Sequence, residues 1–232
     1  MRAGTGQRHV DVAARSTARH ERLPHWHRLA NGSLELMYHR LAPVYDVIYG
    51  AALAPGRRRA MARLAPARGE VILEVGVGTG LSAEQYPRRC RVVAIDISPA
   101  MLDRARSRFA RRGVRHVSLC RMDAGFMGFP DGRFDAVYAP YVINIVSDPL
   151  RVAREMIRVC RPGGRIVLLN HFDDASPGFS PGRLLGRVAS TLTGANWDMD
   201  LQGFLRDAGL VARSIERVNV PGVSSVVVCQ RA

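Results

Sequence analysis

The chain has 232 residues, enough for one α/β domain with appendages and a full core but too few for two large domains. Its formal net charge is +14, and all 34 basic residues are arginine, which suggests a GC-rich coding sequence as much as a selected surface. The basic excess is concentrated at the amino end, where residues 1–68 hold 12 arginines against 4 acids. This distribution suits an anionic partner, either lipid headgroups or nucleic acid.

No stretch approaches the roughly 20 apolar residues that span a bilayer, and the amino end lacks the apolar segment of a secretory signal. We therefore expect an intracellular protein with no transmembrane segment. Residues 1–33 are rich in arginine and histidine, as are organelle transit peptides and disordered extensions, and we favour a disordered basic extension. The four cysteines lie far apart with no histidine at ligand spacing, so we expect buried free thiols and neither a metal site nor a disulfide.

Residues 34–66 are predicted to form an amphipathic helical lid that also contacts the membrane. Apolar residues recur there at spacings of three and four: Leu34, Met37, Leu41, Val44, Tyr45 and Ile48. Pro43 interrupts this stripe, so two short helices fit better than one continuous helix. A further helix should open at Gly56 and reach about Leu64. The remaining residues, 67–232, form the main domain.

The main domain begins with a buried strand that runs into a glycine loop. Residues 71–82 read VILEVGVGTGLS, an apolar run that ends on Glu74 and breaks into Gly76, Gly78 and Gly80. Glycines let the backbone turn tightly and approach a ligand where a Cβ would collide. A helix should begin directly afterwards, with its first amides facing the ligand. This layout predicts a nucleotide-type pocket.

Strands and helices then alternate along the chain. Four further strands are predicted: Arg91–Ile95, His116–Cys120, Phe134–Tyr138 and Arg165–Asn170. The first of them ends at Asp96, twenty residues after Gly76, a spacing that places a carboxylate beside a ribose. The last follows the turn of residues 161–164, which reads RPGG.

Two helices between these strands carry clear start signals. Ser98 caps and Pro99 begins the first, whose sheet-facing residues are Met101, Leu102, Ala105 and Phe109. Asp148 and Pro149 begin the second. Residues 171–200 are expected to be a loop with a helix near residues 184–191, and another helix should cover residues 201–208.

Four motifs in this order resemble the class I S-adenosylmethionine-dependent methyltransferases over roughly residues 37–229. They are Glu74–Gly80, Asp96–Leu102, Phe129–Pro130 with Phe134–Val137, and Arg158–Gly164. The resemblance implies a Rossmann-like α/β fold: a seven-stranded, mostly parallel sheet with helices on both faces and an antiparallel last strand. Residues 211–218 and 224–229 would supply the closing antiparallel pair. The implied cofactor is S-adenosyl-L-methionine.

The resemblance also implies the cofactor contacts, position by position. Glu74 would balance the cofactor's cationic methionine end, Asp96 would accept from the ribose hydroxyls, and Asp123 would accept from the adenine amine. The whole implied set is Glu74, Gly76, Gly78, Gly80, Asp96, Ile97, Met101, Asp123 and Ala124, with Ile97 and Met101 on the two faces of the adenine. Asp135 is more often structural in this fold and stays outside the set.

The methyl acceptor must arrive beside the fourth and fifth strand ends, because methyl transfer is an in-line displacement that depends on orientation. Tyr141 and His171 lie just past these ends. Methyltransferases that act on nucleobase amines usually carry Asp or Asn two residues ahead of a Tyr here. Ala139 occupies that position, which counts against a nucleic-acid partner despite the charge.

A narrower resemblance, to the soluble bacterial phosphatidylethanolamine N-methyltransferases, appears once the amino-terminal segment is included. It rests on Tyr45-Asp46-x-x-Tyr49-Gly50, Gly56–Arg58, Gly76–Ser82 with Tyr86–Pro87, Tyr141–Val146 with Asp148–Pro149, and Asn170–Phe172. That family methylates the lipid amine up to three times, yielding phosphatidylcholine, and visits the membrane peripherally. This chain departs from it in a longer amino-terminal extension and in residues 173–200, which match no motif.

This resemblance implies an acceptor site and a location. Its catalytic residues would be Tyr45, Tyr141, Asn144 and His171, and its substrate-binding residues Tyr38, Tyr49, Arg57 and Asn170. Arg57 and His171 would pair with the lipid phosphate, and His171 or an acid such as Asp46 would help to remove the amine proton. The protein would be cytoplasmic, attached peripherally to the inner face of the cell membrane, with a phospholipid at an anionic membrane surface as its partner.

Two alternatives remain open from the sequence. A quinone-ring C-methyltransferase also carries a Tyr-Asp pair before the glycine loop, but it would need no contacts to an anionic headgroup. A catalytically silent domain that binds S-adenosylmethionine or nucleic acid belongs to a different class. Transfer of labelled methyl groups to crude lipid would separate it from both enzymes.

Overall fold

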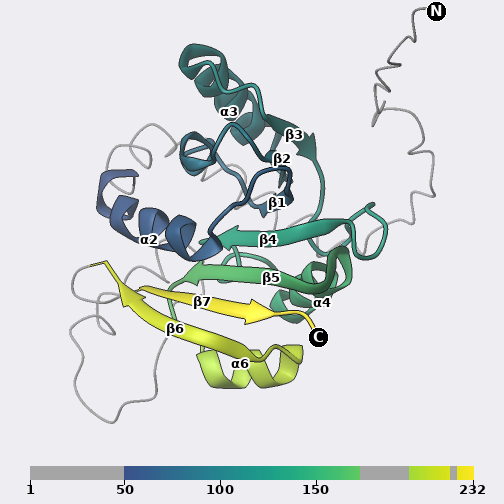
Figure 1. Cartoon of the computed structure of the whole chain (residues 1–232). Coiled ribbons are helices and arrows are strands. Elements are labelled where there is room, and N and C mark those ends of the chain that lie inside the picture. The colour runs from purple at the N-terminus through teal and green to yellow at the C-terminus, as the bar shows by residue number, and fades with distance from the viewer. Residues whose placement is uncertain (1–49, 173–198, 220–223) are drawn as a thin grey trace, which may run out of the picture.

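The computed structural model describes residues 50–172, 199–219 and 224–232, which contain a seven-stranded sheet of order β3-β2-β1-β4-β5-β7-β6 (Figure 1). The strands are β1 (Val71–Val75), β2 (Arg91–Asp96), β3 (Val117–Arg121), β4 (Phe134–Pro140), β5 (Cys160–Asn170), β6 (Ala212–Val218) and β7 (Ser224–Gln230). The helices are α2 (Ala54–Leu64), α3 (Pro99–Arg112), α4 (Pro149–Val159) and α6 (Leu201–Ala208).

The sheet confirms the predicted fold class. Neighbouring strands pair in parallel along β3-β2-β1-β4-β5, and β7 runs antiparallel to both β5 and β6. The side chains of each strand alternate between two faces, so the sheet supports two hydrophobic clusters. Leu73 and Val75 pack on the α4 and α6 side, whereas Ile72 packs on the side of α2 and α3. This is the two-faced Rossmann-like arrangement that the motifs implied.

Helix α3 forms as its start signals predict. The Ser98 hydroxyl oxygen accepts a hydrogen bond from the Met101 amide at 3.4 Å, and Pro99 occupies the first helical position. Its buried residues are Met101, Leu102, Ala105 and Phe109, the four predicted to face the sheet.

The prediction of an α-helix directly after the glycine loop is wrong. Only a short 3-10 turn, η1 (Ala83–Gln85), stands there. Pro87 explains the difference, because a residue that precedes proline is pushed out of the helical region, and Tyr86 is extended at φ −71° and ψ 133°. Too few residues separate Gly80 from Pro87 for a helix of useful length.

The approach to β5 also differs from its prediction. The strand begins at Cys160 rather than at Arg165, and the pairing with β4 jumps from Phe134↔Cys160 to Ala136↔Arg165. The predicted turn of residues 161–164 is therefore a bulge within β5. Asp135 has the structural role expected of it, since its carboxylate accepts from the Val71 amide and from Arg161, both at 2.8 Å.

Several predictions fall on residues that the structure does not describe. They are the basic extension (1–33), residues 34–49 of the lid, and the helix near residues 184–191. Within the described ranges, no helix combines the length and apolarity that crossing a membrane requires.

Arg158 on α4 anchors the loop that joins β3 to β4. Its guanidinium donates to the carbonyl oxygens of Met127 and Phe129, both at 2.7 Å, and to Asp131 at 2.8 Å. It also pairs with Glu155 at 2.7 Å, and Glu155 in turn accepts from the Met127 amide. Three charge-assisted hydrogen bonds from Arg158 therefore hold this loop on the helix, and two more bind Arg158 to Glu155 of the same helix.

We expect Arg158→Ala to lower the free energy of unfolding by about 2–4 kcal/mol, because it leaves two loop carbonyls without donors. Arg154→Ala is the matched control, since Arg154 lies one turn earlier on the exposed side of α4. Urea denaturation followed by circular dichroism measures both variants. Equal losses in the two would show that the loop does not depend on Arg158.

Candidate active site

The ends of five parallel strands meet at one edge of the sheet, and α2 packs near that edge, mainly against β5 and β7 (Figure 1). The predicted site residues follow these strand ends. Those after β1, β2 and β3 form one group and those after β4 and β5 form a second, next to it. Cofactors in such sheets bind beyond the carboxyl ends of the strands.

The three glycines after β1 have different surroundings. A Cβ on Gly76 would lie 2.6 Å from Val142, and one on Gly80 would lie 2.6 Å from the Phe109 ring. A Cβ on Gly78 would meet no atom within 4 Å, and Gly78 has φ +53°. Packing within the protein therefore requires the first and third glycines, whereas the second borders open space that a ligand can approach.

Asp96 ties the glycine loop to the turn after β2. One carboxylate oxygen accepts from the Gly78 amide at 2.8 Å, and the other accepts from the Ser98 amide at 2.9 Å. Burial raises the pKa of this carboxyl, and the two amides oppose the rise. Each oxygen keeps a second lone pair that can accept from a ligand hydroxyl. The next residue, Ile97, is 46% exposed, an unusual state for a large apolar side chain.

The loop after β3 adjoins the same place. The Met122 amide donates to the Asp96 carbonyl oxygen at 3.0 Å, which puts the two loops side by side. Asp123 follows, and its carboxylate accepts from the Gly125 amide at 2.7 Å. Asp123 and Ala124 thus lie in a loop beside the predicted ribose acceptor, and Met101 lies in the first turn of α3, directly after it.

Glu74 is fully buried on the face of β1 that α2 covers. Burial raises the pKa of its carboxyl to about 8, while Tyr86, Ser82 and the charge of Arg57 oppose the rise. Among the described residues, no group meets hydrogen-bond geometry with either carboxyl oxygen or with the buried hydroxyls of Tyr86 and Tyr138, although Tyr86 and Ser82 lie close enough to Glu74 to favour its ionised form. Unpaired buried polar groups are rare in folded proteins. This cluster therefore has the properties of a receptor for a polar, cationic group.

Arg57 lies between the two groups of site residues. It is 6% exposed, and its guanidinium donates to the Gly50 carbonyl oxygen. Its charge opposes the rise in the pKa of Glu74 on one side and of Tyr141 on the other, and burial is the main cause of both rises. The sequence predicted a contact with the lipid phosphate, and the structure places Arg57 where its charge acts on both Glu74 and Tyr141.

The second group centres on Tyr141 and His171, whose ring centroids lie 5.3 Å apart. Tyr141 has φ +55°, an uncommon value for an aromatic residue, and its amide donates to the Leu169 carbonyl oxygen at 2.6 Å. The Asn144 amide group donates to the His171 carbonyl oxygen at 2.8 Å. Asn170 is fully buried, and its side-chain amide has no hydrogen-bond partner among the described residues.

Sequence reasoning missed Asn219 and Ser224, which connect this group to α2. Asn219 accepts from the Gly56 amide at 2.8 Å and donates to the Tyr141 hydroxyl at 2.9 Å and to Ser224 at 3.0 Å. The Ser224 hydroxyl lies 3.1 Å from Nδ1 of His171. A glycine within a helix and an asparagine after a strand were the only signals in the sequence, 163 positions apart.

Three predicted site residues, Tyr38, Tyr45 and Tyr49, lie outside the described residues. The structure brings the other members together in the two adjoining groups, and their individual roles remain predictions. Val142 joins the groups, because it directly follows Tyr141 and contacts Gly76.

Comparison with known proteins gives related enzymes. Residues 73–168 match a family model described as a methyltransferase domain. A phosphatidylethanolamine N-methyltransferase from Cereibacter sphaeroides is 43% identical over 159 residues, which cover 68% of this chain and 76% of that protein. A demethylmenaquinone methyltransferase from Tropheryma whipplei (strain Twist) is 35% identical over 147 residues, which cover 61% of this chain and 60% of that protein.

The crystal structure of the cyclase SpnF aligns with a TM-score of 0.69 at 19% identity, covering 85% of this chain and 94% of that one. At this identity the likeness shows the fold alone, and a cyclase on this fold shows that fold does not decide the reaction. The sequence relatives, the glycine loop and the loops that adjoin it decide the family. The chain belongs to the class I S-adenosylmethionine-dependent methyltransferases.

Proposed function

We propose that this methyltransferase acts on the amine of phosphatidylethanolamine and on its mono- and dimethylated products, leading to phosphatidylcholine. The observation that carries the proposal is the pairing of Tyr141 with His171 at the ends of β4 and β5, one residue from the contact between Val142 and Gly76. An aromatic ring and an imidazole thus lie beside the glycine loop. In the proposal the ring faces the ammonium of the substrate and the imidazole binds its phosphate. The relative from C. sphaeroides supports the same substrate.

The residues present fit the cofactor. Gly78 leaves its backbone open to a ligand, Asp96 keeps lone pairs for hydroxyls, and Ile97 exposes an apolar surface suited to a base. The unpaired carboxyl of Glu74 suits an ammonium group. When bound, S-adenosylmethionine supplies a methyl group that is activated by the adjacent sulfonium.

The acceptor requires deprotonation and then stabilisation of a cation. A primary amine has a pKa of about 10, so it must lose a proton before its lone pair can form the new N–C bond. Each transfer leaves a more methylated ammonium, and aromatic faces stabilise such cations by about 0.5–2 kcal/mol per contact. The proposal gives this role to the Tyr141 ring and gives the attraction of an anionic headgroup to Arg57, whose charge acts on Tyr141.

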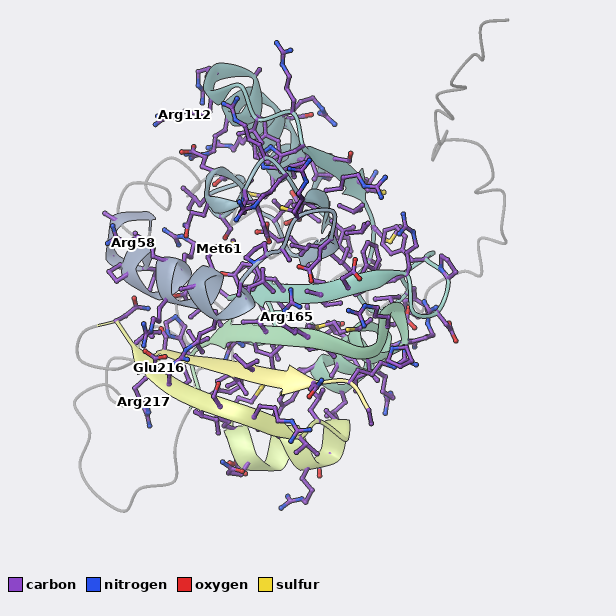
Figure 2. The ribbon with its side chains drawn as sticks, viewed as in Figure 1. Arg58, Met61, Arg112, Arg165, Glu216 and Arg217 are labelled. Carbon is purple, nitrogen blue, oxygen red and sulfur yellow. The ribbon has the colours of Figure 1, made fainter. Side chains whose placement is uncertain are left out.

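Peripheral contact with the inner face of the membrane belongs to the same proposal. Helix α2 carries exposed Arg58 on the side of the molecule where Arg217 of β6 also lies (Figure 2). Glu216 pairs with Arg59 and Arg63 of the same helix, so their charge is partly balanced. Each arginine near an anionic surface adds on the order of 1 kcal/mol to binding.

A quinone-ring C-methyltransferase is the second candidate, and the relative from T. whipplei favours it. Methylation of a ring carbon produces no ammonium and involves no phosphate. The activity of such an enzyme would therefore not depend on a hydrogen bond from His171 to an anionic headgroup.

The cofactor assignment predicts that Gly78→Arg abolishes binding of S-adenosylmethionine while the protein stays folded, since the new side chain fills open space. Gly113→Arg is the matched control, because Gly113 also has positive φ, at +63°, with no atom near its missing Cβ, and it caps the far end of α3. Isothermal titration calorimetry measures the affinity and thermal unfolding the stability. Unchanged affinity in Gly78→Arg would contradict the assignment.

The buried carboxyl predicts a specific pH dependence. The pKa of Glu74 rises from 4.5 in a solvated chain to about 8 in the fold, so between these values only the folded state holds the proton. The free energy of unfolding should therefore fall as pH rises from about 5 to 8, by a few kcal/mol, and Glu74→Gln should flatten this slope. If Glu74 faces the cofactor's ammonium, binding at pH 7 should also release about one proton.

Calorimetry in two buffers of different ionisation enthalpy measures that proton release, and urea denaturation across pH measures the slope. Asp123→Asn is the control for loss of a carboxylate near the site. A binding reaction that releases no proton in the unsubstituted enzyme would place the ammonium away from Glu74.

The acceptor assignment predicts that Tyr141→Ala and His171→Ala each lower methylation of phosphatidylethanolamine vesicles at least tenfold, about 1.4 kcal/mol of transition-state stabilisation. The affinity for S-adenosylmethionine should change little. Mass spectrometry of the lipid products gives the rates. Methylation of a demethylated quinone with phosphatidylethanolamine left untouched would replace this proposal by the second candidate.

A further inference from the structure

One backbone amide sets the direction of each hydrogen bond on the path to His171. The Gly56 amide can only donate, so the Asn219 atom 2.8 Å away must be the carbonyl oxygen Oδ1. The other arm of this side chain is then its NH2 group, which donates to the Tyr141 hydroxyl at 2.9 Å and to Ser224 at 3.0 Å. The orientation of the asparagine amide thus follows from hydrogen-bond chemistry.

Ser224 comes next on this path, and it is fully buried. Its oxygen accepts from Asn219, so its hydroxyl hydrogen needs an acceptor, and Nδ1 of His171 lies 3.1 Å away. The Tyr141 hydroxyl oxygen is the other nearby acceptor, and it also accepts from Asn219. A neutral imidazole nitrogen is also far more basic than a phenol oxygen. Ser224 therefore donates to His171.

We infer that Asn219 and Ser224 are positioning residues that hold His171 in the neutral tautomer with its proton on Nε2. The lone pair of Nδ1 is used by Ser224, and Nε2 is a hydrogen-bond donor. The opposite tautomer would turn Nδ1–H toward Ser224 and leave the Ser224 hydroxyl only the Tyr141 hydroxyl oxygen, a weaker acceptor than an imidazole nitrogen.

This tautomer decides between two roles that the sequence left open for His171. In this form His171 has no lone pair to take the proton of an amine, but it can donate to an oxygen of an anionic headgroup. This last step rests on the proposed function, whereas the tautomer itself does not. His171 then orients the acceptor, and another group removes the proton.

Nuclear magnetic resonance of the full chain labelled with nitrogen-15 histidine tests the tautomer directly. Long-range nitrogen–proton spectra distinguish a protonated Nδ1 from a protonated Nε2, and loss of one set of signals in His171→Gln identifies His171 among the 7 histidines. We expect a protonated Nε2 and an unprotonated Nδ1. A protonated Nδ1 in the neutral ring would overturn the inference, and this measurement needs no variant that alters the network.

Two variants test the residues that hold the tautomer. Asn219→Asp keeps an acceptor for Gly56 but replaces the NH2 group by a second oxygen, to which both hydroxyls would donate. Ser224 would then accept from His171, so the proton should move to Nδ1. Ser224→Ala should give a mixture of tautomers. Unchanged His171 signals in both variants would overturn the positioning role.

Ser225→Ala is the matched control. Ser225 is the next residue of β7, equally buried, faces the opposite side of the sheet, and makes no hydrogen bond through its hydroxyl among the described residues. Its removal should leave the His171 signals in place. A shift as large as that of Ser224→Ala would mean that general packing, rather than the hydrogen bond, sets the tautomer.

Kinetics separates this inference from the proposed function. Asn219→Asp should raise the KM for phosphatidylethanolamine vesicles about tenfold, with a smaller change in kcat and unchanged affinity for S-adenosylmethionine. A protonated Nε2 in an enzyme that ignores this lipid would refute the proposed function and support the tautomer. Efficient lipid methylation by an enzyme with a protonated Nδ1 would support the proposed function and refute the tautomer.

Discussion

Five neighbouring strands run in the same direction, and this constraint brings the site together. Whatever follows the last residue of each strand must lie on one edge of the sheet, so loops far apart in sequence become neighbours. The Met122 amide reaches the Asp96 carbonyl because β2 and β3 end side by side. Val142 reaches Gly76 because β4 and β1 do the same. The division of the predicted site residues into two groups follows from strand order alone.

Helix α2 and the antiparallel pair β6–β7 complete the edge from the other side. Gly56 allows α2 to approach so closely that a Cβ there would lie 2.7 Å from the Asn219 amide nitrogen and 2.8 Å from the Tyr141 hydroxyl. The same helix carries Arg57 over Glu74. One helix therefore adjoins both groups, and any movement of α2 would change the surroundings of Glu74 and of Tyr141 together.

The sequence predicted most of the fold because its local signals were strong. Ser98 and Pro99 start α3, and the bounds of α6 match their prediction at both ends. The prediction failed where one proline outweighed a general pattern, at Tyr86–Pro87, and where the bulge in β5 replaced a turn. The predicted strand-end residues share one edge, but the contacts of Asn219 depend on the tertiary meeting of distant segments, which no local pattern encodes.

The short turn after the glycine loop has a consequence for ligand choice. A long helix there would present several free amides and a positive dipole end, which attract phosphates. This chain has instead the three-residue η1 and, close behind it, a buried acid. The loop thus offers little field for an anion, and only a cation beside Glu74 would favour ionisation of its buried carboxyl. Among small molecules that contain adenosine, we therefore expect such a pocket to favour a cationic sulfonium over a dinucleotide that carries a pyrophosphate.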